Sequence, residues 1–250
     1  MKPLVGYEWP EGRSKQVVYI SQDHHIHELV VGIGGEWQHA DLMTLAGAPR
    51  ASSRFLVGYA WPEGGTKQVA YLGPDDHIQE LSVHAGGTWQ HVDLNAITGA
   101  PPAVQVTAGY SWVVGRSKQV VFVGDDDHIH ELVVEMDKPW RHVDLTAMTN
   151  APRPASKYMV GYEWALGQSK QVAYVGQDGH IHELSVEAGG TWQQANLTEL
   201  AQAPITPITS IDGYAWSTDG SKKVAYVGDD GEVRELWMPR GGTWAYADLS

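Results

Sequence analysis

Residues 161–192 of this chain read GYEWALGQSKQVAYVGQDGHIHELSVEAGGTW, and the stretch occurs five times with small changes. Its opening Gly-Tyr pair recurs at steps of 51 or 52 residues, at Gly6, Gly58, Gly109, Gly161 and Gly213. A first tryptophan series keeps the same step: Trp9, Trp61, Trp112, Trp164 and Trp216. So does a second: Trp37, Trp89, Trp140, Trp192 and Trp244. A fixed period of this length indicates a repeat architecture.

Each repeat is predicted to contain four short strands, which in the first copy span residues 5–9, 16–20, 26–31 and 37–41. Side chains of the first strand alternate between its two faces, and Tyr7 and Trp9 share one face. The turn before the third strand contains Asp178-Gly179 in the fourth copy, which is a strong hairpin signal. After the fourth strand, an Asp in a capping position and a later Pro predict a single helical turn.

Four strands in about 50 residues, repeated five times, predict an all-β protein with the fold of a five-bladed β-propeller, each blade having four antiparallel strands. A parallel β-solenoid is the alternative fold, and it ranks lower because its coils are usually shorter than this repeat, roughly 20–30 residues. We expect one propeller domain over residues 1–250, with repeat units at about 5–56, 57–107, 108–159, 160–211 and 212–250.

The composition narrows the function classes. The formal charge of the 250 residues is −13, from 17 basic and 30 acidic side chains, which argues against a nucleic-acid partner. The absence of cysteine excludes disulfides and cysteine–zinc sites. No apolar run is long enough for membrane insertion, and the N-terminus shows no signal peptide. We therefore expect a soluble protein, with its compartment unassigned.

The third strand of every repeat carries a glutamate among apolar residues: Glu28, Glu80, Glu131, Glu183 and Glu235. An isolated buried carboxylate costs several kcal/mol, so each needs hydrogen-bond donors. We predict that each glutamate pairs across the ladder with the polar residue of the second strand, namely Gln16, Gln68, Gln119, Gln171 and Lys223. Two interpretations stay open: a satisfied structural group, or half of a sugar-binding fork.

The two tryptophan series are predicted to differ in their location. The series that starts at Trp9 lies beside small residues on a strand and is expected in the core. The series that starts at Trp37 follows the Gly34-Gly35 turn, where an indole could be core or could pack on the C–H face of a sugar ring.

The pattern His-x-His, as in His25 and His27, places two imidazoles on one face of the third strand. A zinc site needs three or four converging ligands, and the second and fifth copies lose part of the pair. We expect these imidazoles to be hydrogen-bonded at blade rims, and we predict neither a metal nor a cofactor.

These residues resemble the fucose-binding β-propeller lectins of fungi and bacteria over the whole chain. In the first repeat the resemblance rests on Trp9, Val17-Val18-Tyr19, Ile26-His27-Glu28 and Gly35-Glu36-Trp37. The blade count is also similar to that of the tachylectin type, which recognises N-acetylated sugars.

The resemblance implies sugar sites between neighbouring blades, each formed by an Arg of the second strand, the Glu of the third and a Trp of the next blade. Here the Arg position holds Gln16 and its counterparts, and Lys223 in the fifth copy. The implied pairs are Glu28 with Trp89, Glu80 with Trp140, Glu131 with Trp192, Glu183 with Trp244 and Glu235 with Trp37.

The sequence thus predicts a multivalent carbohydrate-binding lectin whose partners are glycans with fucosylated or N-acetylated ends. Five copies of a weak site on one chain would raise the effective concentration for later contacts. The alternatives are a protein-interaction or structural propeller without a sugar site and, less favoured, a propeller enzyme. We predict no catalytic residues, because no nucleophile–base pair is evident.

Overall fold

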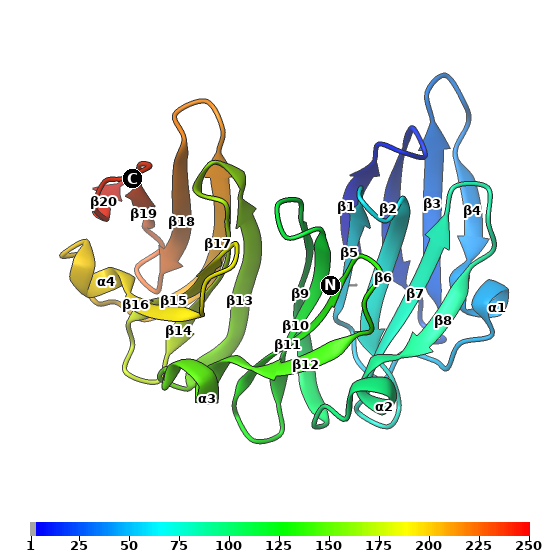
Figure 1. The fold of residues 1–250 in the computed structure, drawn as a ribbon, viewed down its shortest axis with the longest axis horizontal. Helices are drawn as coiled ribbons and strands as arrows, with labels where there is room; N and C mark the ends of the chain where they lie inside the picture. Colours follow the sequence, from blue (N-terminus) through cyan, green and yellow to red (C-terminus); the bar gives the residue numbers. More distant parts are fainter. Residues whose placement is uncertain (1–3) are drawn as a thin grey trace. The chain divides into compact units, whose positions relative to one another are not determined.

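The computed structural model describes residues 4–250, apart from the side chains of residues 156 and 157. It contains five sheets of four strands (Figure 1). The strands of the first two sheets are β1 (Leu4–Trp9), β2 (Ser14–Ile20), β3 (Ile26–Gly32), β4 (Gln38–Asp41), β5 (Leu56–Trp61), β6 (Thr66–Leu72), β7 (Ile78–His84) and β8 (Gln90–Asp93). Those of the last three are β9 (Ala103–Trp112), β10 (Ser117–Gly124), β11 (Ile129–Glu135), β12 (Arg141–Asp144), β13 (Pro154–Trp164), β14 (Ser169–Gly176), β15 (Ile181–Glu187), β16 (Gln193–Asn196), β17 (Ile208–Trp216), β18 (Ser221–Gly228), β19 (Val233–Met238) and β20 (Ala245–Asp248).

Each sheet is a meander in which strands adjacent in sequence are hydrogen-bonded neighbours. The first sheet has the order β1-β2-β3-β4, with antiparallel pairing throughout. The predicted four strands per repeat are therefore confirmed. Hairpins of this kind need only short turns between strands.

A short helix follows each of the first four sheets: α1 (Leu42–Ala46), α2 (Leu94–Thr98), α3 (Leu145–Thr149) and α4 (Leu197–Leu200). A single turn of 3₁₀ helix, η1 (Ala165–Gly167), precedes β14. Asp41 caps α1 by accepting from the backbone amides of Met43 and Thr44. Gly47 ends that helix at a φ of 64°, a backbone conformation that glycine adopts without strain. The predicted helical turn with an Asp cap is confirmed.

The middle strands explain why neighbouring sheets pack on one another. Every residue of β6 and of β14 is buried, so both faces of these strands are covered. Val18 and Ile26 of the first sheet share a core with Val69 and Tyr71 of the second. Such apolar burial on two faces is typical of a central strand in stacked sheets.

The Gly-Tyr pairs allow this close stacking. A Cβ atom on Gly58 would lie 2.6 Å from Cε1 of Tyr7, in the preceding sheet. Gly213 has the same relationship to Tyr162. The tyrosine ring thus contacts the glycine of the next repeat closely, and this is the packing reason for the repeated glycine.

The chain divides into two compact units. The first comprises residues 1–111, 116–126 and 131–143, and the second comprises residues 112–115, 127–130 and 144–250. The prediction of one propeller domain over residues 1–250 stays a prediction. Among the described helices, none is long and apolar enough to cross a bilayer.

Candidate functional site

The predicted pairing of Gln16 with Glu28 is wrong by two residues. The ladder places Gln16 opposite Val30 and Glu28 opposite Val18. The amide of Gln16 instead donates to the Ser14 hydroxyl at 2.7 Å. The counterparts Gln68, Gln119 and Gln171 likewise donate to the Ser or Thr two residues before them. These glutamines are buried, and their hydrogen bonds stay within the second strand.

The partner of each buried glutamate is a lysine from the next sheet. Lys67 Nζ donates to both carboxylate oxygens of Glu28 at 2.7 Å. Lys118 pairs with Glu80 at 2.6 Å, and Lys222 pairs with Glu183. Lysine and glutamate are almost fully buried in all three pairs. This lysine precedes the glutamine in sequence and therefore points to the opposite face of the second strand.

Two indoles enclose each of these ammonium groups. Lys67 Nζ lies 5.2 Å from the ring centroid of Trp9, which belongs to the preceding sheet, and 5.2 Å from that of Trp89, which belongs to its own. Lys222 is held in the same way, 5.3 Å from Trp164 and 5.1 Å from Trp244. These separations lie within the range of cation–π attraction. Each pair is thus shielded from water on both sides.

A tyrosine of the first strand completes the site. The Tyr162 hydroxyl donates to Glu183 Oε2 at 3.1 Å, while Lys222 binds the other oxygen. Burial raises the pKa of the Glu183 carboxyl, against the opposing effect of Lys222. In the pair between the first two sheets, burial likewise raises the pKa of Glu28 and lowers that of Lys67. Within each pair, the attraction between the two partners opposes this effect of burial.

The fifth sheet forms the same arrangement from its own residues. Lys223, which stands where the other repeats have glutamine, pairs with Glu235 at 3.0 Å. The Tyr214 hydroxyl donates to the other oxygen of Glu235 at 2.8 Å. Lys223 Nζ lies 5.3 Å from the ring of Trp216 and 5.5 Å from that of Trp237. Here the predicted neighbours Lys223 and Glu235 do come together.

Four of the five tryptophans in the first series are buried as predicted, and burial varies within the second series. Trp9, Trp61, Trp112 and Trp164 are buried, whereas Trp216 is 49% exposed. In the second series, Trp37 is 51% exposed, and Trp244 is buried. Its other members, Trp89, Trp140 and Trp192, are half-buried.

Three of the five implied Glu–Trp pairs meet through a lysine that lies between them. Lys67 joins Glu28 to Trp89, Lys118 joins Glu80 to Trp140, and Lys222 joins Glu183 to Trp244. The remaining two, Glu131 with Trp192 and Glu235 with Trp37, join residues of different units and stay predictions. Sequence reasoning missed the lysines, although Lys15, Lys67, Lys118, Lys170 and Lys222 recur as regularly as the glutamates.

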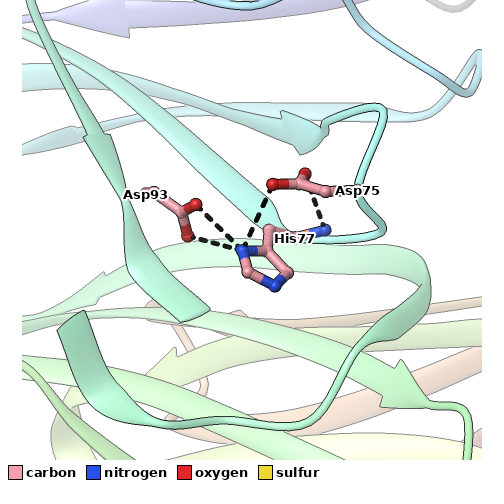
Figure 2. Close-up of side chains that lie close together, drawn as sticks. All are labelled: Asp75, His77 and Asp93. Carbon is pink, nitrogen blue, oxygen red and sulfur yellow. Dashed lines mark hydrogen bonds and ion pairs between the residues drawn. The ribbon is translucent and has the colours of Figure 1, made fainter. Parts of the chain in front are cut away.

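The histidine at the start of the third strand is bound by the capping aspartate. His25 Nδ1 lies 2.8 Å from Asp41 Oδ2, and His77 Nδ1 lies 2.9 Å from Asp93 Oδ2. Figure 2 shows His77 between Asp93 and Asp75, whose carboxylate is 3.4 Å from Nδ1. These three side chains could supply a metal with ligands. Asp93 already accepts from the Ala96 amide, so the cluster has a structural use as a helix cap.

Two clefts lie near the rims of the sheets. One, of about 450 Å³, lies between the β13–β14 turn and the β19–β20 turn and is lined by Trp164, Gln168, Glu187 and Arg240. The other, of about 600 Å³, is formed by the first sheet around Lys15 and Trp37. Both are of the size that small-molecule sites have.

Neither a family model nor a curated protein matches this sequence. Solved structures match it in fold. The BP39L lectin from Burkholderia pseudomallei superimposes with a TM-score of 0.79 at 13% identity, over 100% of this chain and 70% of that one. AofleA from Arthrobotrys oligospora gives 0.66 at 19% identity, over 99% and 70% of the two chains. The Aleuria aurantia lectin, a six-bladed β-propeller, gives 0.58 at 15% identity, over 99% and 78%.

The fold is that of the β-propeller lectins. The resemblance found in the sequence is thereby confirmed for the architecture. The solved Aleuria lectin has six blades, whereas this chain has five four-stranded sheets. Closure of these five sheets into one five-bladed propeller stays a prediction. Within the β-propeller lectin fold, the Lys–Glu–Trp arrangement is the feature of this chain that calls for a functional interpretation.

Proposed function

We propose that this chain is a multivalent carbohydrate-binding lectin and that it binds its ligands without transforming them. The fold supports this proposal, because the structures that share it are described as lectins. The SapL1 lectin was solved with α-methyl fucoside, and the Aleuria lectin is described by its fucose recognition. At 13–19% identity, these neighbours support an architecture, so the sugar site has to be argued from this chain's own residues.

The observation that carries the proposal is the arrangement on the fifth sheet, where the half-exposed Trp216 and Tyr214 lie beside the mostly buried Lys223 and Glu235. Glu235 offers a carboxylate that accepts hydrogen bonds from the Lys223 ammonium and from the Tyr214 hydroxyl. Vicinal sugar hydroxyls can both donate to such a carboxylate and accept from such an ammonium. Beside them lies the Trp216 indole, about half of which is exposed and available to the C–H face of a sugar ring.

The glutamates between sheets have a different role. Glu28, Glu80 and Glu183 are buried, and each is already paired with a buried lysine of the next sheet. We therefore assign them to holding neighbouring sheets together. We propose a structural role for them instead of the implied role as sugar ligands, because their side chains are almost fully buried.

A second location fits a sugar between adjacent blades. The 450 Å³ cleft of the fourth and fifth sheets is lined by the Glu187 carboxylate, the Gln168 amide and the Arg240 guanidinium, with the apolar Leu166 and Met238 beside them. Two sites on one chain would make binding to a glycan-coated surface multivalent. The proposed ligands are glycans with fucosylated or N-acetylated ends, and the proposed frame is a single five-bladed propeller over residues 1–250.

Isothermal titration of the full chain with methyl α-fucoside and with N-acetylglucosamine tests the proposal. We expect a dissociation constant of about 1 mM for one of them, which corresponds to about 4 kcal/mol. Glu235→Gln should weaken binding about tenfold, and Trp216→Ala should do the same. Glu232→Gln is the matched control, because it removes the same charge from the exposed turn before β19.

Two outcomes would contradict the proposal. One is a Glu235→Gln variant that keeps its fold by circular dichroism and binds sugar as the Glu232→Gln control does. The other is a wild-type chain that binds no sugar on a glycan array, which would favour a structural or protein-binding propeller.

A further inference from the structure

Three side chains that can ligate a metal converge in the second sheet, at the end where β7 begins. Asp75 lies in the turn between β6 and β7, His77 directly precedes β7, and Asp93 ends β8 and caps α2. Figure 2 shows both carboxylates facing His77 Nδ1. The three ligand atoms lie within 4.8 Å of one another. All three residues belong to the first compact unit, so their geometry is set within that unit.

Each of the two carboxylates is oriented by a backbone amide. Asp75 Oδ1 accepts from the His77 amide at 3.3 Å, and its Oδ2 lies 3.4 Å from His77 Nδ1. Asp93 Oδ1 accepts from the Ala96 amide at 2.9 Å, and its Oδ2 lies 2.9 Å from the same imidazole nitrogen. Each aspartate thus keeps one oxygen on the backbone and turns the other toward the imidazole. Supporting hydrogen bonds of this kind hold metal ligands in position.

The His77 imidazole cannot satisfy both carboxylates equally. Its Nδ1 carries at most one hydrogen, which lies in the plane of the ring, so it can form one well-aligned hydrogen bond. Two negative charges therefore face a single donor. A divalent cation in place of that hydrogen would be bound by the nitrogen and by one oxygen of each carboxylate, and it would neutralise both charges.

In the fourth repeat, the aspartate of the same turn has a different partner. Asp178 Oδ1 lies 3.0 Å from His182 Nε2, within hydrogen-bond distance. In the second repeat, this histidine is replaced by Gln79, whose amide carries no charge. Asp75 faces His77 instead. The substitution at position 79 therefore accounts for the second carboxylate at the imidazole.

The first and fifth repeats also differ from the second at this turn. Asp230 of the fifth repeat pairs with Arg234 at 2.6 Å. Asp23 of the first repeat accepts from the Ser21 hydroxyl, and His25 pairs with the capping aspartate of its own sheet at 2.8 Å. The first repeat thus offers equivalent residues in a different arrangement, which makes it a source of matched controls.

We propose that Asp75, His77 and Asp93 form a binding site for a divalent transition-metal ion, with Zn²⁺ as the ion whose preferred ligands they match. Zinc binds imidazole nitrogen and carboxylate oxygen at about 2.0–2.2 Å, and an imidazole ligand favours it over Mg²⁺ and Ca²⁺. At this bond length, the ligands of a tetrahedral site are about 3.4 Å apart. Asp75 Oδ2 already has that separation from His77 Nδ1, and Asp93 Oδ2 would move by about 0.5 Å to reach it.

A bound ion would connect the β6–β7 turn to the residue that caps α2. Three protein ligands leave a fourth position for water or for a ligand oxygen. The ion would stabilise the folded chain, because the three ligands are brought together only by folding. The inference goes beyond the proposed lectin function, since neither the site nor its test involves a sugar.

Titration of the metal-free full chain with Zn²⁺, in competition with a chromophoric chelator, tests the proposal. We expect Asp75→Asn to weaken zinc binding at this site by at least about tenfold, because three protein ligands are the fewest that a zinc site has. The new amide keeps an oxygen that can accept from the His77 amide, so the turn should keep its conformation. His77→Gln should weaken zinc binding as much. Zinc should also raise the thermal midpoint of wild type by more than that of either variant.

Asp23→Asn and His25→Gln are the matched controls, because they make the same changes at the equivalent positions of the first repeat. Both should bind zinc as wild type does. The proposal is overturned if wild type binds no zinc, or if Asp75→Asn binds it in the same amount and as tightly as Asp23→Asn. Displacement of the zinc by an equal concentration of Ca²⁺ would also overturn it, since the group would then be an unselective acidic patch.

Discussion

Lys67 donates to both carboxylate oxygens of Glu28 across the boundary between the first and second sheets. The two residues are separated by 39 positions and are buried together between the indoles of Trp9 and Trp89. Because the arrangement recurs at Glu80 and Glu183, it is a feature of the repeat. A repeat array is stabilised by such nearest-neighbour interfaces.

Removing one member of this pair should destabilise the protein strongly. We expect Glu28→Gln to lower the free energy of unfolding by about 3–5 kcal/mol, since it leaves the buried Lys67 ammonium without a counter-charge. The double variant Glu28→Leu with Lys67→Met should recover most of that loss, because an apolar pair needs no desolvation of charge. Urea denaturation of the single and double variants measures both effects. A Glu28→Gln variant as stable as wild type would show that the pair contributes nothing.

The Gly-Tyr packing predicts a difference between two equivalent glycines. Gly58→Ala would place a Cβ atom 2.6 Å from the Tyr7 ring, so we expect a loss of about 1–3 kcal/mol from overpacking. Gly6→Ala is the control, because the nearest atom to its Cβ would be a backbone oxygen 3.7 Å away. Thermal unfolding of the two variants should separate them. Equal midpoints would contradict the packing argument.

The repeats made the fold predictable from sequence. Each copy shows alternating strand residues, a turn and a capping residue, and the five copies repeat these signals at equivalent positions. The bounds of the strands that contain Trp9 and Glu28 are therefore predicted to within one or two residues. The register between the strands is predicted wrongly, because it depends on where the turn is centred. The predicted pairing of Gln16 with Glu28 requires a turn centred on Gln22, whereas Ile20 pairs with Ile26, which moves the centre by one residue and the pairing by two.

The site was predictable in its residue types and not in its contacts. The recurrence of Glu28 and its counterparts correctly indicated buried carboxylates that need donors. The donor is Lys67, which belongs to the next sheet. No pattern within one repeat shows which face of a blade meets its neighbour. The need of each buried carboxylate for a counter-charge would have indicated it, since a lysine recurs at the same place in the second strand of every repeat.

The capping aspartates predict a loss of stability in acid. Burial raises the pKa of Asp41, but hydrogen bonds from Thr44 and His25 outweigh it and hold that pKa well below its usual range. The pKa values of Asp93 and Asp144 are lowered for similar reasons. A carboxyl whose pKa is depressed by folding contributes stability above its unfolded pKa, near about 3.9, and loses it as the pH falls further.

Asn196 shows how to test this, because it caps α4 as the aspartates cap the other helices. The triple variant Asp41→Asn, Asp93→Asn and Asp144→Asn should keep its helices and lose less stability than wild type between about pH 5 and pH 2. Urea midpoints across that range give the comparison. The raised pKa of Glu28 acts in the opposite direction and is common to both proteins, so it cancels. Parallel pH profiles would contradict the assignment.

Two neighbouring members of the first tryptophan series, Trp164 and Trp216, should respond differently to truncation. Trp164 is buried, donates from its Nε1 to the Gly220 carbonyl at 3.1 Å and covers Lys222. We expect Trp164→Ala to cost about 3–5 kcal/mol of stability, as large core truncations do. Trp216→Ala removes a half-exposed ring and should cost well under half as much, while it weakens sugar binding. Guanidinium denaturation combined with sugar titration separates the roles, and a Trp216→Ala variant that unfolds as readily as Trp164→Ala would place this indole in the core, where no ligand could reach it.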